Sequence, residues 1–130
     1  MNALSPREAA RSAVVAHPGR PATSVVIDTP DVRAIVFRLA PGQVVPPHRN
    51  ASTVLLTVLE GEGILSGEDD GVAVDRACTA GDMIVYAPNE LHAMRAETVE
   101  LLLLATITPR PGERNAAGNL SAGQDSGGSR

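Results

Sequence analysis

The stretch that decides the fold is Gly42-Gln43-Val44-Val45-Pro46-Pro47-His48-Arg49-Asn50-Ala51-Ser52-Thr53-Val54, followed at short distance by Gly61. A second stretch of the same kind is Gly81-Asp82-Met83-Ile84-Val85-Tyr86-Ala87-Pro88-Asn89-Glu90-Leu91-His92. Both begin at a glycine, run through aliphatic residues and a proline, and reach a histidine. Glycine, proline and asparagine mark turns, while the runs of valine and isoleucine favour strands. Each stretch therefore predicts a strand that is entered or left through a turn and carries a histidine.

Further runs of β-branched residues lie on both sides of these stretches, and turn residues separate them at short intervals. Many short strands with glycine and proline turns and no helices between them indicate an all-β sandwich or barrel. The expected strands are Thr23–Asp28, Val32–Ala40, Val44–Pro46, Ser52–Glu60, Gly63–Ser66, Val72–Cys78, Met83–Ala87, His92–Ala96 and Val99–Thr108. We read Gly61 as the turn that ends one of these strands.

The two ends of the chain differ from this β-rich part. Ser5 suits a helix N-cap, Pro6 the first helical turn and Glu8 the capping-box position, so the sequence predicts a short helix over Ser5–Ala16. The C-terminal end is rich in Gly, Ser, Ala and Asn and has too few large apolar residues to bury itself. We expect an N-terminal helix and arm over 1–22, a β domain over 23–108 and a disordered tail over 109–130.

Composition excludes several classes of function. A chain of 130 residues suffices for one domain with a core of its own. The aromatic share is only 2%, so a pocket would have aliphatic walls and no stacking platform for bases. The 11 basic residues are all arginines scattered along a chain of net charge −4, which argues against nucleic-acid binding. Arg38, within a predicted strand, is expected to face solvent.

No apolar run is long enough to span a bilayer, and no segment resembles a signal peptide, so we expect a cytoplasmic protein with no membrane partner. Cys78 is the only cysteine and cannot form an internal disulfide. Its place in a predicted strand favours a buried, small apolar role.

Together the two histidine stretches resemble the two motifs of the cupin superfamily, whose small single-domain members fold as jelly-roll β-barrels around a metal or ligand pocket. The first motif of that family is glycine, five residues, histidine, one residue, histidine, three or four residues, glutamate, six residues and glycine. Gly42, His48 and Gly61 lie in register with it, whereas Asn50 stands at the second histidine and Val54 at the glutamate.

The second motif of the family is glycine, five residues, proline, one residue, glycine, two residues and histidine. Gly81 and His92 match it, Pro88 is displaced by one place, and Asn89 stands at the second glycine. Asparagine tolerates the left-handed conformation almost as well as glycine, so the turn should persist. The resemblance covers about residues 32–108.

The resemblance implies that metal ligands arise from the four motif positions, which here hold His48, Asn50, Val54 and His92. Imidazole nitrogen binds divalent transition metals well, an amide oxygen binds them weakly, and valine does not bind them. We expect His48 and His92, with a weaker contribution from Asn50, to hold at most a loosely bound zinc, iron, manganese or nickel ion. A pocket without metal is the alternative.

Strand alternation predicts which side chains share the barrel interior with these histidines. If His48 points inward, residues of the same parity should do so too, and the same holds after His92. The expected lining of the pocket is Val54, Leu56, Val58 and Met94. No Tyr or Asp stands beside either histidine in the sequence to suggest the acid–base pair of sugar-epimerase cupins.

These features predict a small single-domain cupin that binds a small molecule inside the barrel, with or without a weakly held metal. A metal-dependent dioxygenase or isomerase is one alternative, and a ligand-sensing cupin without chemistry is another; the sequence leaves open whether the protein is an enzyme. A homodimer is also expected, in which the Thr23–Asp28 strand crosses to a partner sheet and protects an exposed edge.

Overall fold

One long strand, β4 (Thr53–Asp69), organises the fold in a computed structural model that describes residues 1–110. The 17 residues of β4 pair with different neighbours along its length. Its first half lies between β8 (Leu101–Thr108) and β6 (Met83–Tyr86). Its second half lies between β5 (Val72–Thr79) and β7 (His92–Arg95). β4 is therefore common to both sides of the barrel.

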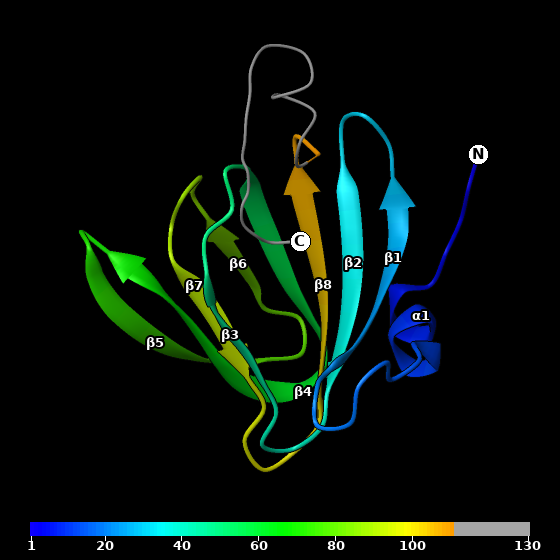
Figure 1. The fold of residues 1–130 in the computed structure, drawn as a ribbon, viewed down its shortest axis with the longest axis horizontal. Coiled ribbons are helices and arrows are strands. Elements are labelled where there is room, and N and C mark those ends of the chain that lie inside the picture. The colour runs from blue at the N-terminus through cyan, green and yellow to red at the C-terminus, as the bar shows by residue number, and fades with distance from the viewer. Residues whose placement is uncertain (111–130) are drawn as a thin grey trace.

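The remaining strands extend the sheet from these neighbours. β2 (Arg33–Leu39) pairs with β8, and β1 (Ala22–Asp28) pairs with β2. On the other side, β3 (Val44–His48) pairs with β7. All the pairs are antiparallel, and the sheet curls so that β1, β2 and β8 stand opposite β3, β7 and β5 (Figure 1). The prediction of an all-β barrel of the jelly-roll type with a short N-terminal helix is confirmed.

Side chains alternate between the interior of the barrel and its outside, as strand geometry requires. Along the first half of β4 every second residue is buried, and β2 and β8 contribute their own inward aliphatic side chains. The main core cluster consists of Leu39, Val54, Leu56, Val58, Leu65, Cys78, Tyr86, Met94, Ala96, Leu101, Leu103, Ala105 and Ile107. Cys78 is buried, as the sequence predicts.

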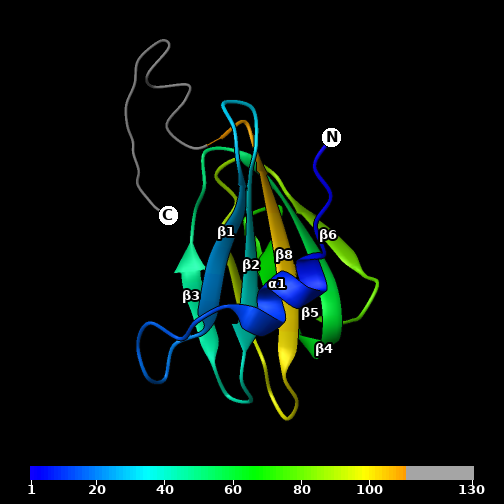
Figure 2. The same ribbon diagram turned by 90° about the vertical axis from the view of Figure 1, so that its right-hand side faces the viewer.

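The helix α1 (Pro6–Ser12) covers the outer face of β1, β2 and β8 (Figure 2). Ser5 is its N-cap, and its Oγ accepts a hydrogen bond from the Glu8 N–H at 3.3 Å. The helix is shorter than predicted, because Ala13 is already extended and the β-branched pair Val14-Val15 follows it. Within residues 1–110, no helix is long and apolar enough to cross a membrane.

Arg38 lies under this helix, so the expectation that it faces solvent is wrong. Its guanidinium Nη1 donates hydrogen bonds to the carbonyl oxygens of Ala10 and Arg11, at 2.6 and 2.8 Å. These carbonyls lie in the last turn of the helix, where carbonyl groups lack their regular helical partners, and that of Ala10 also accepts the Ala13 N–H at 3.4 Å. Arg38 therefore anchors the helix to the sheet, and only 20% of its side chain is exposed.

Gly61 also differs from the prediction, because it does not end a strand. β4 continues through it, with a bulge between Val58 and Glu60. Gly61 has φ +79°, and a Cβ at this position would overlap the backbone carbonyl of Glu100. A glycine with free φ and no side chain lets the strand bend while its neighbour approaches closely.

The predicted tail over 109–130 lies almost wholly outside the described residues. The predicted N-terminal strand is present as β1, paired with β2 of the same chain. A single chain does not test an exchange with a second copy, so the homodimer stays a prediction.

Gly61→Ala should lower the free energy of unfolding by about 3 kcal/mol or more, because it combines backbone strain with overlap against Glu100. Gly42→Ala is the matched control, since Gly42 also has positive φ (+87°) but nothing within 4 Å of the added Cβ. It should cost only about 1 kcal/mol. Urea unfolding followed by far-UV circular dichroism measures both; equal losses would contradict the close approach.

Candidate functional site

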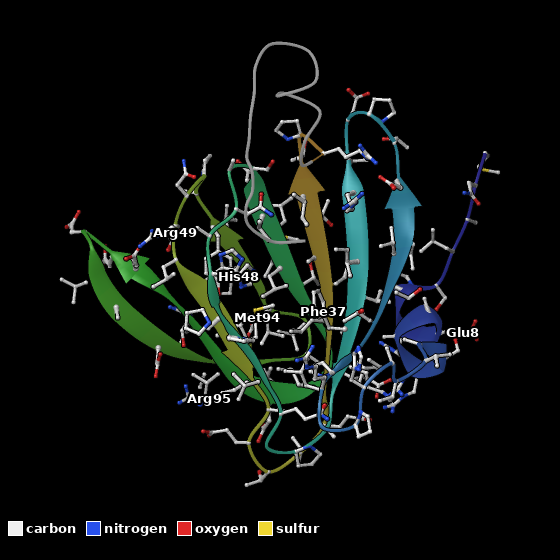
Figure 3. All side chains as sticks on the ribbon, viewed as in Figure 1. Glu8, Phe37, His48, Arg49, Met94 and Arg95 are labelled. Carbon is white, nitrogen blue, oxygen red and sulfur yellow. The ribbon has the colours of Figure 1, made fainter. Side chains whose placement is uncertain are left out.

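His48 and His92 face each other across neighbouring strands. They are direct partners in the antiparallel pairing of β3 with β7, so their side chains project from the same face of the sheet. Their ring centroids are 4.1 Å apart, with the planes tilted by 58°. Figure 3 shows His48 pointing into the space between the strands, on the same side as Met94. The structure therefore brings the two motif histidines together inside the barrel.

Both rings are oriented by the same local hydrogen bond. The Nδ1 of His48 lies 2.9 Å from the carbonyl oxygen of Pro46, and the Nδ1 of His92 lies 3.0 Å from that of Glu90. A carbonyl oxygen only accepts, so each neutral ring carries its proton on Nδ1. The lone pair of each ring is then on Nε2, the atom that a ligand or metal would meet.

His92 is the more buried of the two histidines, with 4% of its surface exposed, whereas His48 is half-buried. Burial lowers the pKa of His92 below its ordinary value of 6.5, because the charged ring loses its hydration. The hydrogen bond to Glu90 opposes this shift, and the nearby His48 adds to it. At neutral pH His92 is thus a neutral ring with an available lone pair.

Tyr86 completes the site, although the sequence pointed to no aromatic partner for either histidine. Its ring stacks on His92, with centroids 4.5 Å apart and planes 24° from parallel. Tyr86 is 2% exposed, and its hydroxyl has no hydrogen-bond partner among the described residues. Burial strongly raises the pKa of this hydroxyl, with smaller contributions from Cys78 and Glu90, so it remains protonated at neutral pH.

A network of polar side chains fixes the loops that carry the two histidines. Both carboxylate oxygens of Glu90 accept backbone N–H groups, from Ala87 and Glu68, each at 2.9 Å. The Glu68 carboxylate accepts the Leu91 N–H at 3.1 Å. Arg49 donates to the Asn89 carbonyl at 2.7 Å and forms an ion pair with Glu68. The segment before His92 is thereby tied to the end of β4 and to the residue after His48.

Asn50 belongs to this framework. Its Oδ1 accepts the Ser52 N–H at 2.9 Å, and its backbone carbonyl accepts the Asn89 N–H at 2.7 Å. Asn89 has φ +67°, the left-handed conformation that the sequence predicts for it. The amide oxygen that would ligate a metal therefore already holds the turn after His48.

The four residues expected to line the pocket are all buried. Val54, Leu56, Val58 and Met94 belong to the main core cluster, together with Tyr86. Val54 is the cross-strand partner of Tyr86, and the second half of β4 returns to the site by pairing with β7. The walls around the two imidazoles are thus aliphatic, apart from the tyrosine.

Comparisons with known proteins agree with this geometry. The family model for the cupin domain matches residues 35–107, which is more than half of the chain. The chain belongs to the cupin family. A comparison with curated proteins gives no match.

Solved structures of other proteins show the same fold. A conserved protein with a double-stranded β-helix domain from Klebsiella pneumoniae is 22% identical, with a TM-score of 0.70 over 85% of this chain and 91% of that one. An RmlC-like cupin from Desulfovibrio desulfuricans is 27% identical, with a TM-score of 0.64 over 75% of this chain and 91% of that one.

The DMSP lyase DddQ from Ruegeria pomeroyi is 20% identical, with a TM-score of 0.62. The alignment covers 68% of this chain but only 47% of the lyase. At this identity the likeness concerns the fold alone, and this cupin spans about half the length of that enzyme.

The donor set does not fit a metal held firmly by the protein alone. Two imidazole Nε2 atoms are suitable ligands, but a catalytic zinc site usually has three protein ligands. Within residues 1–110, no group of three or more His, Cys, Asp or Glu side chains could hold a metal ion. Val54 supplies no donor at the position of the family's glutamate, and no carboxylate offsets the charge of a dication there.

Sequence reasoning missed Tyr86 and Glu90 as parts of the site. Tyr86 lies in the second motif stretch, but its contact with His92 arises only when β6 pairs with β4 and β7 pairs with the far half of β4. Glu90 is separated from Glu68 by 22 positions, and neither residue matches a family motif position. No local pattern could have joined them.

The depressed pKa of His92 should make stability depend on pH. The unfolded chain takes up a proton near pH 6.5 and the folded chain only at lower pH, so the free energy of unfolding begins to fall below 6.5. The contribution is fully present above 6.5 and is lost once the pH falls through the lower folded value. His92→Gln should flatten this slope, and exposed His17→Gln should not. Urea unfolding at a series of pH values measures this dependence. If the free energy of unfolding fell equally with pH in the wild type and in both variants, the depressed pKa would not belong to His92.

Proposed function

We propose that this cupin binds a small, uncharged organic molecule inside the barrel and holds a polar group of that molecule with the Nε2 atoms of His48 and His92. The observation that carries the proposal is the pair of inward imidazoles, 4.1 Å apart, with both Nδ1 atoms committed to backbone carbonyls. Pockets for small molecules are usually apolar, with a few polar groups that converge. The aliphatic walls and the two lone pairs have this character.

An uncharged ligand suits the electrostatics of the interior. The buried polar residues among those described are Asn50, Ser52 and His92, and none of them is a charged side chain. A charged group transferred from water into such surroundings would lose its hydration without gaining a counter-ion. Neutral hydroxyl groups can instead donate directly to the imidazole lone pairs.

In this proposal a divalent cation is at most weakly held. Two imidazoles would bind zinc, iron, manganese or nickel only with further donors from water or the ligand, and a bound metal would supply Lewis-acid polarisation of the ligand. A metal-dependent dioxygenase or isomerase is less well supported, because two of the four family ligand positions hold Asn50 and Val54. Relatives of the same fold carry out too many activities for the fold to name a substrate.

The direct test is the small molecule that accompanies the purified protein. His48→Ala removes one of the two lone pairs and should abolish retention of the molecule, whereas His17→Ala, which changes an exposed residue, should leave it unchanged. Mass spectrometry of the supernatant after acid denaturation measures the released compound. Absence of any compound from the wild type, or equal amounts from His48→Ala, would argue against the proposal.

Val54→Glu tests whether the pocket is a metal site that lacks a ligand. The new carboxylate would stand at the family position and be buried, so without metal the variant should be less stable by several kcal/mol, about 3 or more. Zinc should restore much of this loss, because the carboxylate and the two imidazoles give three ligands.

Val58→Glu is the control, since it buries the same carboxylate about 13 Å further along β4, away from the histidines. Thermal unfolding with zinc and with chelator measures both variants. If zinc stabilised the two variants equally, the barrel would not position residue 54 as metal-binding cupins do.

A further inference from the structure

Among the described residues, Tyr86 supplies the site with an unused hydrogen-bond donor, whereas the unused Nε2 atoms of the two histidines are acceptors. The Tyr86 hydroxyl is a buried donor without a partner among residues 1–110. Buried polar groups almost always have hydrogen-bond partners, because a buried group without one has lost its hydrogen bonds to water and gained none in exchange. A phenylalanine would keep the stack on His92 without that cost. The hydroxyl therefore needs a hydrogen-bond partner from outside the described residues, and a bound ligand would supply one.

Its position places this partner beside the histidine pair. Tyr86 contacts His92 ring to ring and is the cross-strand neighbour of Val54, where the family motif has a glutamate. Where the family has a carboxylate, which accepts hydrogen bonds or binds metal, this chain has a valine with a phenol beside it. A phenol that stays protonated donates. This part of the site therefore offers a hydrogen-bond donor where other family members offer an acceptor.

From these contacts we propose that Tyr86 donates a hydrogen bond to a carbonyl oxygen of the ligand, and that the ligand is a neutral α-hydroxycarbonyl compound. The proposal rests on the binding function assigned above to His48 and His92. The imidazole Nε2 atoms accept, so the ligand presents a hydroxyl to them; Tyr86 donates, so the ligand presents an acceptor to it. The His92 ring lies next to both other rings, with its centroid 4.1 Å from that of His48 and 4.5 Å from that of Tyr86, so we assign the hydroxyl and the carbonyl of the ligand to adjacent carbons.

Met94 can provide the space that such a ligand needs. It follows His92 on the same face of β7 and belongs to the core cluster that contains Tyr86. Figure 3 shows it on the inner side of the sheet together with His48. A methionine side chain is unbranched and adapts to different neighbours at low cost. We assign it the role of filling the space near the tyrosine when the ligand is absent.

The experiment uses hydroxyacetone as the probe, the smallest ketone with a hydroxyl on the adjacent carbon. Acetone lacks the hydroxyl, and 1,2-propanediol lacks the carbonyl. Binding is followed by the NMR signals of the His48 and His92 rings, and the hydrogen bond by near-ultraviolet absorption. Tyr86 is the only tyrosine and the chain has no tryptophan, so this absorption reports on the proposed donor.

Hydroxyacetone should shift both imidazole signals of the wild type and move the tyrosine absorption to longer wavelength, as expected when a phenol donates. Tyr86→Phe should weaken hydroxyacetone binding about three- to tenfold, the usual effect of one hydrogen bond, and leave 1,2-propanediol binding unchanged. Thr57→Val is the matched control: it removes a hydroxyl from the outer face of β4, between the inward Leu56 and Val58, and should behave as the wild type.

Equal hydroxyacetone affinity in the wild type and Tyr86→Phe, with the imidazole signals still shifting, would overturn the role of Tyr86 and leave the histidine function standing. Failure of every probe to shift the imidazole signals of the wild type would overturn both proposals. If Tyr86→Phe did not fold, the tyrosine absorption of the wild type would decide: a shift with hydroxyacetone but not with 1,2-propanediol supports the proposal, and an unchanged spectrum overturns it.

Discussion

The site depends on one repeated interaction, the hydrogen bond from a histidine Nδ1 to the carbonyl oxygen two residues earlier in the chain. It occurs at His48 with Pro46 and at His92 with Glu90. In each case the bond fixes both the orientation of the ring and the nitrogen that carries the proton. Without it the lone pairs could turn toward the backbone, and the interior would contain two polar rings without a common direction.

The rest of the fold holds the carbonyls in place for these bonds. Glu90 receives two backbone N–H groups and so fixes its own peptide, whose carbonyl orients His92. Glu68, near the far end of β4, in turn accepts the Leu91 N–H from the loop before His92. Gly67 leaves room for this arrangement, because a Cβ there would lie 2.9 Å from Glu90 Oε2 and 3.0 Å from the Tyr86 ring. The loop before His92 therefore both packs against the end of β4 and orients the His92 ring.

Local pattern was enough to predict the barrel and the short helix, because strand alternation and turn residues are properties of neighbouring residues. The resemblance to the cupin motifs selected His48 and His92, and their direct pairing is seen only in the structure. Local pattern failed where distant segments meet. The sequence around Gly61 is typical of a turn, but in the structure Gly61 lies within β4, where the backbone of Glu100 approaches it closely. Arg38 has an ordinary strand neighbourhood, and only the packing of α1 gives it two carbonyls to bind. Tyr86 joins the site through strand pairing, which no single stretch of sequence specifies.

The most direct measurement is the tautomer of the two buried rings, read from long-range ¹H–¹⁵N NMR correlations of the free protein at neutral pH. The structure predicts that His48 and His92 carry their protons on Nδ1 and have unprotonated Nε2 atoms, while exposed His17 serves as the internal reference. Protons on Nε2 in both rings would remove the paired lone pairs from the barrel and contradict the account at its centre.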